Sequence, residues 1–231
     1  MNKERLQNEL STRGIILDEK KLNALFALMH STLEMNEKFN LTAIKEEDAF
    51  IEKMIFDSAI ALQELDLTDK KVIDVGTGAG FPGMVLYILN PDMHLTLLDS
   101  TKKKIDYLDD YCHQNGYQVE CLTGRVEELN RREQYDYAFA RAVAPLNILL
   151  EIITPLLKVG GTFIALKALG YEKELEDSQN ALKKLGCHLE KIIEDQLPES
   201  LEKRVMIYIV KDKETQKKYP RQYSEIKKLP L

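Results

Sequence analysis

A glycine-rich turn is the feature of this sequence that most clearly suggests ligand binding. The stretch from Val72 to Gly83 reads VIDVGTGAGFPG, and its four glycines follow directly after an apolar run. Because glycine has no Cβ, such a turn can bend tightly and let the backbone approach a ligand. Gly78-x-Gly80-x-x-Gly83 matches the spacing of dinucleotide-binding turns. Gly76-x-Gly78-x-Gly80 matches the spacing in nucleoside-binding methyl-transfer enzymes.

An acidic residue follows at a position that suits either ligand. Asp99 ends the next apolar run, HLTLLD, and precedes Ser100 and Thr101. At the end of the second strand of a parallel sheet, a carboxylate can accept both ribose hydroxyls of an adenosine. A purely structural turn is the alternative, but the strand-turn-helix context and the acid at the next strand tip favour a nucleoside site.

The residues that close the turn help to choose between the two ligands. A pyrophosphate requires free backbone N–H groups at a helix N-terminus. Phe81 is bulky and Pro82 has no N–H, which disfavours a pyrophosphate and favours S-adenosylmethionine over a nicotinamide dinucleotide. In this interpretation Gly83 packs the helix, and Asp74 helps to orient the ammonium group of the ligand through loop amides or water.

Two later segments supply further candidate site residues. TGRVEEL offers Val126 to cover a face of adenine and Glu127 or Glu128 to accept from its amino group, although these acids can equally form a solvated helical turn. FARAVAPL offers Arg141, which can pair with the carboxylate of the ligand, a phosphate or a guanine edge, or form a structural ion pair.

The chemistry of the acceptor follows from residues that the chain lacks. The stretch Arg141–Pro145 after the expected fourth strand has no carboxamide, and the sequence contains neither a Pro-Cys pair nor a G-x-S-x-G motif. The acceptor atom must therefore already be nucleophilic, as a ring nitrogen with a free lone pair is. Catalysis would then consist of aligning the reacting atoms and excluding water, with Arg141 as the best candidate for a positioning residue.

Alternating strands and helices place these segments. Apolar runs that predict strands begin at residues 71, 94, 119, 135, 162 and 204, and amphipathic stretches between them predict helices, including one from Pro145 to the glycine pair at 160–161. This alternation predicts an α/β fold with a Rossmann-like, mostly parallel, doubly wound sheet. In that fold ligands bind at the carboxyl ends of the strands, which is where the candidate residues lie.

The segment before the first strand is expected to be helical. One buried face is predicted by the helical spacing of Leu22, Leu25, Phe26, Met29 and Leu33, and an apolar stripe continues from Ile51 to Leu62. We therefore expect an N-terminal helical cap over residues 1–66 and a ligand-binding domain over residues 67–213. A basic tail over residues 214–231 should pack on or beside that domain.

Composition narrows the class of protein. The 231 residues are 44% hydrophobic and 30% charged, which is typical of a globular protein, and the net charge of −6 argues against general nucleic-acid binding. Residues 211–231, with seven basic and three acidic side chains, can make a localised contact with a polyanion or simply solubilise the chain. Three separate cysteines and four scattered histidines lack metal-ligand spacing, so we expect no metal. With no signal peptide or membrane span apparent, we expect a cytoplasmic protein.

Taken together, the motifs resemble those of the glucose-inhibited division protein B family (GidB), bacterial methyltransferases of small-subunit ribosomal RNA. The matching pieces run in order from Phe39 to Leu231 and are FNLTAI, IFDS, VIDVGTGAGFPG, LLDSTKKK, GRVEEL, ARAVAPL, ALKA and YPRQYSEIKKLPL. The chain departs from the family pattern at Met54, where many relatives have His, and at Ala168, where they have Gly.

The resemblance implies an activity, a cofactor and a set of site residues. It implies a class I S-adenosylmethionine-dependent methyltransferase that modifies nitrogen 7 of a guanine in 16S ribosomal RNA, within the assembled small subunit. We expect the enzyme to be a monomer. A non-catalytic nucleoside-binding assembly factor and a nicotinamide-dependent oxidoreductase are the alternatives. The cofactor-binding residues carried over, together with Gly78 from the turn, are Gly76, Phe81, Asp99, Ser100, Thr101, Val126, Glu127 and Arg141.

The resemblance also gives the basic residues a role. An enzyme that recognises a ribosomal particle needs only a localised basic surface beside its cofactor. We expect such a surface from the tail together with Lys102, Lys103, Lys104, Arg125, Arg131, Arg132 and Lys167, although the three consecutive lysines can also be the solvated start of a helix.

Overall fold

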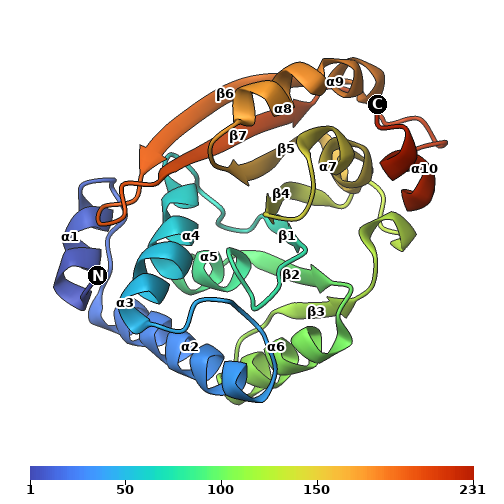
Figure 1. Cartoon of the computed structure of the whole chain (residues 1–231). Helices are drawn as coiled ribbons and strands as arrows, with labels where there is room; N and C mark the ends of the chain where they lie inside the picture. The colour runs from blue at the N-terminus through green and yellow to red at the C-terminus, as the bar shows by residue number, and fades with distance from the viewer.

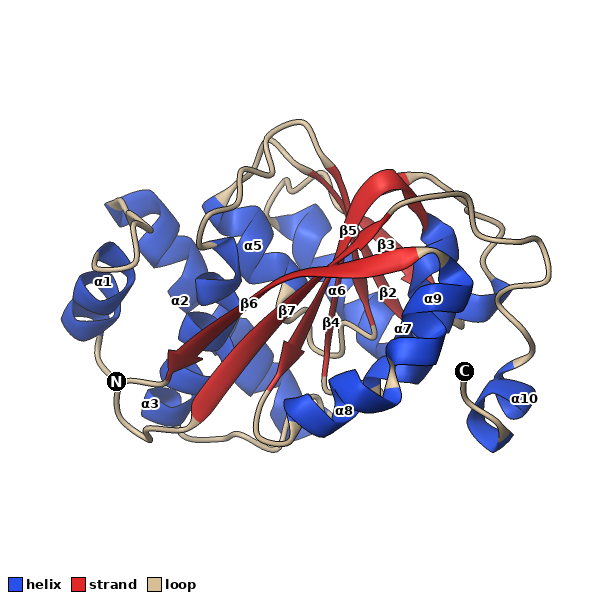
Figure 2. Cartoon of the chain, turned by 90° about the horizontal axis from the view of Figure 1, so that it is seen from above, coloured by secondary structure: helices blue, strands red, loops and turns tan.

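The computed structural model describes residues 1–231 and contains one seven-stranded sheet between two layers of helices (Figures 1 and 2). The strand order is β3-β2-β1-β4-β5-β7-β6. The strands from β1 to β5 pair in parallel, and β7 runs antiparallel to both β5 and β6. The expected mostly parallel, doubly wound sheet is therefore confirmed. The strand bounds are β1 Lys71–Val75, β2 His94–Asp99, β3 Glu120–Thr123, β4 Tyr135–Arg141, β5 Leu157–Lys167, β6 Cys187–Gln196 and β7 Lys203–Lys211.

The core is divided by the sheet because successive strand residues point to opposite faces. Val72 and Phe139 face the layer formed by the N-terminal helices, α5 and α6, whereas Ile73 and Ala138 face the layer of α7 to α10. The two layers are visible on either side of the sheet in Figure 2. The helix bounds after β1 are α5 Gly83–Leu89, α6 Lys102–Gln114, η3 Val126–Glu128, α7 Leu146–Ile153, η4 Thr154–Leu156, α8 Tyr171–Asp177, α9 Gln179–Leu185 and α10 Tyr223–Lys228.

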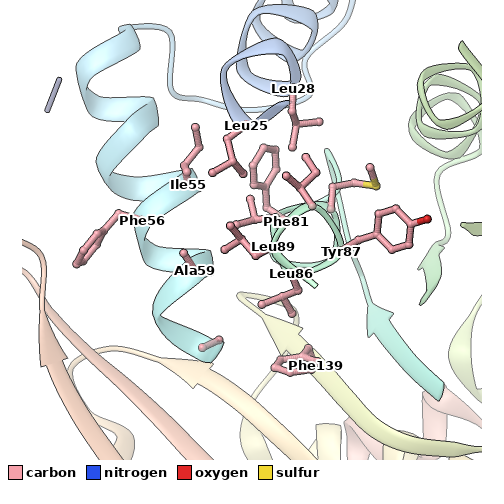
Figure 3. Packing of buried hydrophobic residues seen from close by; sticks show 14 of the residues in the cluster. Leu25, Leu28, Ile55, Phe56, Ala59, Phe81, Leu86, Tyr87, Leu89 and Phe139 are labelled. Atoms are coloured by element: carbon pink, nitrogen blue, oxygen red, sulfur yellow. The ribbon is translucent and has the colours of Figure 1, made fainter. Parts of the chain in front are cut away.

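The N-terminal segment is helical, as expected, and packs over α5. Leu25 and Leu28 of α2 meet Ile55 and Phe81 in one apolar cluster (Figure 3). The stripe from Ile51 to Leu62 does not form one regular α-helix, because its first half is a π-helix and its last turn is a 3-10 helix. The segment bounds are α1 Lys3–Ser11, α2 Glu19–Lys38, α3 Glu47–Phe50, η1 Ile51–Phe56, α4 Asp57–Ala59 and η2 Ile60–Leu62.

Two parts of the expected element pattern are wrong. The glycine pair at 160–161 does not end a helix: α7 stops at Ile153, and the pair lies inside β5, where the pairing with β4 is irregular. The strand β6 has no counterpart among the expected elements. Its exposed and half-buried residues alternate along a sheet edge, so it lacks the continuous apolar run that marks the buried strands.

The residues after β7 return along the α7 side of the sheet. The guanidinium of Arg221 and its backbone N–H donate three hydrogen bonds to Glu151 of α7, at 2.6 to 3.0 Å, and the Glu151 side chain is fully buried. Ile226 of α10 is also fully buried. The tail is thus fixed beside the domain by a buried ion pair and an apolar contact. No helix of the chain combines the length and the apolar character needed to cross a membrane.

Candidate active site at the carboxyl edge of the sheet

Three adjoining cavities open where β1, β2 and β4 end. The central cavity has a volume of about 440 Å³, the small cavity about 180 Å³ and the large cavity about 780 Å³. Val143, in the loop after β4, lines all three. The structure brings every predicted cofactor-binding residue to this edge. The central cavity is lined by Gly76, Gly78, Phe81, Asp99, Ser100, Thr101 and Arg141, and the small cavity by Val126 and Glu127 together with Gly76, Asp99 and Ser100.

Two glycines in the turn are required for different reasons. Gly76 has a φ of +72°, and a Cβ on it would lie 2.5 Å from Cγ2 of Val143, so glycine suits the close approach of the loop after β1 to the loop after β4. Gly78 has a φ of +61° and nothing within 4 Å of a Cβ built on it, so a side chain there would project into the open cavity. The cavity is therefore shaped by a missing side chain, as expected where a ligand passes close to the backbone.

Asp99 is oriented by the backbone before any ligand binds. Its Oδ2 accepts from the N–H of Gly78 at 2.9 Å, and its Oδ1 accepts from the N–H of Thr101 at 2.8 Å. A carboxylate has about four acceptor positions, so each oxygen keeps one free for a ligand hydroxyl. With only 8% of its surface exposed, Asp99 presents those positions in a poorly hydrated site. This arrangement fits the diol of a ribose and hence the adenosine moiety of S-adenosylmethionine.

The hydrogen bonds of the turn exclude a pyrophosphate in addition to the missing N–H of Pro82 at the start of α5. The N–H groups of Gly80 and Phe81 both donate to the carbonyl of Thr77, and the N–H of Gly83 donates to Asp74. The N-terminus of α5 therefore has no row of free donors for phosphate oxygens. The Phe81 ring does not block the site, because it turns into the core (Figure 3). There it packs edge-on against Phe50 with 5.4 Å between ring centroids.

Asp74 supports the turn from inside the protein. Its Oδ2 accepts from the Thr77 hydroxyl at 2.6 Å and from the N–H of Gly83 at 2.8 Å, and its Oδ1 has no hydrogen-bond partner. At 1% exposure it does not line any of the three cavities. It thus holds the loop and the start of α5, and its expected effect on a ligand ammonium through loop amides or water stays a prediction. Gly83 packs α5 as expected, since a Cβ there would meet Leu97 at 2.4 Å.

The buried carboxyl of Asp74 gives a testable pH dependence. Loss of hydration raises the pKa of Asp74 from 3.8 to about 6, although the hydrogen bonds from Thr77 and Gly83 oppose this rise. Between these pH values the folded chain keeps a proton that the unfolded chain has lost, so its stability falls as the pH rises. Relative to the Asp74→Asn variant, the free energy of unfolding of the wild type should fall by about 2 kcal/mol from about pH 4 to about pH 7. Urea unfolding across this pH range measures the difference, and parallel profiles would contradict the assignment.

Arg141 lies on the wall between the central and large cavities. Its Nη1 donates to the Lys53 carbonyl at 3.1 Å and to Oδ2 of Asp57 at 3.4 Å, and Arg204 approaches the same Asp57 oxygen at 3.0 Å. Burial lowers the pKa of the Arg141 guanidinium, while the carboxylates of Asp57 and Asp74 raise it. Directly after Arg141, Ala142 adopts a φ of +55°, an unfavourable conformation for a residue with a Cβ. The boundary between the two cavities is therefore held by charge pairing and by a strained loop.

The large cavity is lined by charged groups that are already paired. Glu174 accepts from Lys167 at 2.6 Å, and Glu202 is paired with Lys53 and Arg204. Together with Asp57, these are the three carboxylates in its lining. Every carboxylate in the large cavity is thus engaged by a cation.

The expected basic surface is partly wrong. Lys104 lines the central cavity, Arg125 the small cavity and Lys167 the large cavity. Arg131 instead pairs with Glu120 at the start of β3, at the opposite edge of the sheet. Arg132 donates to the carbonyls of Thr215 and Tyr219 and so anchors the tail. The sequence alone could not show which of these basic side chains face the cavities, because that depends on how the segments that carry them pack in the fold.

Sequence reasoning missed several residues of the site. Leu41 and Thr42 reach the central cavity from the N-terminal segment, Met54 reaches both larger cavities from η1, and Tyr223 reaches the small cavity from the tail. These positions lie within or beside the FNLTAI, IFDS and tail motifs. In the sequence those motifs supported the resemblance to a family, but they gave no physical role to the residues. Only the fold shows that segments so far apart in sequence meet at one edge.

Comparisons with known proteins agree with this geometry. A family model described as rRNA small subunit methyltransferase G matches residues 20–204. Ribosomal RNA small subunit methyltransferase G from Fusobacterium nucleatum subsp. nucleatum is 44% identical over 217 residues, which cover 93% of this chain and 93% of that protein. The protein of the same name from Bacillus cytotoxicus is 38% identical over 243 residues, covering 100% of this chain and 99% of that protein.

Solved structures show the same fold at low sequence identity. TYW2 from M. jannaschii, in complex with AdoMet, aligns with a TM-score of 0.59 and 14% identity, covering 74% of this chain and 80% of that one. A SAM dependent methyltransferase from Aquifex aeolicus aligns with a TM-score of 0.55 and 15% identity, covering 77% of this chain and 98% of that one. The sheet and its helices are thus those of Rossmann-like methyltransferases.

Proposed function

The chain belongs to the rRNA small subunit methyltransferase G family, and on that basis we propose that it methylates nitrogen 7 of a guanine in the 16S ribosomal RNA of the small ribosomal subunit. It is a methyltransferase, and S-adenosylmethionine is its cofactor. The observation that supports an acceptor base beside the methyl donor is that the central and large cavities share a wall formed by Met54, Arg141, Ala142 and Val143. A base in the large cavity would meet the methyl donor along that wall.

The residues of the central cavity have defined tasks in this proposal. S-adenosylmethionine supplies a methyl group that is electrophilic because it is bonded to a positively charged sulfur. Asp99 accepts the ribose hydroxyls, and Gly78 leaves the space that the ligand occupies. Arg141 stands at the boundary and keeps donor and acceptor in line, which is the main source of rate when no proton is moved.

The state of the carboxylates supports a ring nitrogen as the acceptor. An exocyclic amine must lose a proton during methylation, so its enzyme benefits from a base or a carbonyl acceptor at the reacting atom. Asp57, Glu174 and Glu202 are all ion-paired in the large cavity. Nitrogen 7 of guanine has a free lone pair and no proton, so its methylation needs alignment without a base. We propose that the reaction takes place in the cytoplasm, on assembled subunits, with the enzyme as a monomer.

A direct assay tests the whole proposal. Small subunits from a strain that lacks this methylation are incubated with the enzyme and tritiated S-adenosylmethionine, with large subunits and naked 16S RNA in parallel. We expect label in 16S RNA of the subunits, at nitrogen 7 of one guanine. Absence of label in every RNA, with cofactor binding intact, would favour a non-catalytic assembly factor. Label on another atom would overturn the atom assignment.

Two lysines at the start of α6 should contribute to RNA binding. Lys102 and Lys103 are exposed in the first helical turn, where the helix dipole disfavours positive charge. Replacing both with alanine should raise the KM for subunits about tenfold and reduce the salt dependence of binding by a slope of roughly 1 to 2, because each phosphate contact releases counterions. Filter binding from about 50 to about 300 mM salt, the range in which such slopes are measured, provides the test.

The matched control replaces another exposed lysine pair. Lys183 and Lys184 lie in α9, just before β6, at the opposite edge of the sheet from the cavities. Their alanine variant should behave as wild type in subunit binding. Equal salt slopes for the two double variants would show that the start of α6 is not part of the RNA contact.

A further inference from the structure

The C-terminal segment reaches the cofactor side of the molecule. Tyr223, the first residue of α10, lines the small cavity together with Arg125, Val126 and Glu127. The guanidinium carbon of Arg125 lies 5.9 Å from the centre of the Tyr223 ring. A tail residue thus shares a wall with residues that follow β3, although the two segments are far apart in sequence.

Two arginines hold the tail that carries this tyrosine against the domain. Arg221 pairs with the fully buried Glu151 of α7, and Arg132 donates to the carbonyls of Thr215 and Tyr219 at 2.8 and 2.6 Å. The fully buried Ile226 fixes the other side of Tyr223. The aromatic ring is therefore positioned before a ligand arrives, which reduces the entropic cost of binding.

The small cavity is suited to a base attached to a ribose in the central cavity. The two cavities share Gly76, Asp99 and Ser100, so a ribose held by Asp99 directs its base into the small cavity. Apolar side chains from β1, β2 and α7, namely Val75, Leu98 and Ile152, line its inner part. Its volume of about 180 Å³ admits a single planar ring system.

We infer that Tyr223 is a cofactor-binding residue and that the C-terminal segment closes the adenine subsite. The ring of Tyr223 packs against the purine, and Arg125 supports the tyrosine from outside by a cation–π contact. Stacking of an aromatic side chain on a base strengthens binding by a factor of roughly 5 to 150 per base. The inference rests on the proposed function only through S-adenosylmethionine as the cofactor, and it does not depend on the identity of the methylated atom.

Calorimetry with S-adenosylhomocysteine tests the inference without an activity assay. Tyr223→Ala should weaken its binding about tenfold, and Tyr223→Phe should leave it within about twofold, because the ring is retained. The loss should be equal for 5′-methylthioadenosine, which keeps the adenine and lacks the amino acid. Leu229→Ala is the control, since Leu229 is an exposed tail residue outside the cavity. A folded Tyr223→Ala protein with wild-type affinity would overturn the inference.

A fluorescent variant covers the case in which the alanine variant unfolds. The chain contains no tryptophan, so Tyr223→Trp introduces a single reporter. Its emission should change on binding S-adenosylhomocysteine, whereas that of Tyr171→Trp, at a residue that lines none of the three cavities, should not. Unchanged emission of the Tyr223→Trp variant at saturating ligand would refute the contact. If the wild type binds no S-adenosylhomocysteine at all, the cofactor assignment fails instead.

Discussion

Replacing Asp99 with asparagine should weaken S-adenosylhomocysteine binding at least about 100-fold and abolish methylation at ordinary cofactor concentrations. Hydrogen bonds to a charged group contribute about 1.5 to 3 kcal/mol each, and the carboxylate is expected to accept two ribose hydroxyls. Its oxygens also hold the N–H groups of Gly78 and Thr101. An asparagine has one carbonyl oxygen for these four donors, and its NH₂ group faces a donor.

The measurement is calorimetric titration with S-adenosylhomocysteine, and thermal unfolding shows whether the variant folds. Asp106→Asn is the matched control, because Asp106 lies in the neighbouring helix α6 and pairs with the exposed Lys102 outside the cavities. The control should bind the ligand as the wild type does. If folded Asp99→Asn retained an affinity within about tenfold of the wild type, the ribose assignment would be wrong.

Replacing Arg141 with lysine should reduce kcat for ribosomal RNA methylation by about 100-fold, with a much smaller change in the KM for subunits. The planar guanidinium reaches the Lys53 carbonyl and Asp57 through Nη1 and the Met54 sulfur through Nη2, and a single ammonium group cannot occupy both positions. A displacement of about 1 Å at the boundary between donor and acceptor can cost this factor through misalignment. The charge is retained, so the protein should remain folded.

Arg204→Lys separates alignment from the loss of an ion pair. Arg204 contacts the same carboxylate, Asp57, but lines only the large cavity. Its variant should bind S-adenosylhomocysteine as the wild type does and retain a higher kcat than Arg141→Lys. Steady-state kinetics with purified subunits gives both constants. Equal losses of kcat in the two variants would show that the effect of Arg141 passes through Asp57 and not through its own position.

The local patterns in the sequence predicted much of the cofactor side of the site. Continuous apolar runs identified the buried parallel strands, and the strand ends or the loops directly after them carry Gly76, Asp99, Val126 and Arg141. These residues meet because the carboxyl ends of parallel strands lie at one edge, a rule that needs no knowledge of side-chain contacts. The edge strand β6 was missed because an alternating, half-exposed strand resembles many other segments.

What the sequence by itself determined was the set of residues at the strand ends and, through its motifs, the family. Only the tertiary structure decided which distant segments complete the site. It brought Met54 from a π-helix, Arg204 from β7 and Tyr223 from the tail to the cavities, and it turned the Phe81 ring into the core. The physical reason is range: turn chemistry and strand periodicity act over a few residues, whereas these placements depend on packing and ion pairs between elements far apart in the chain.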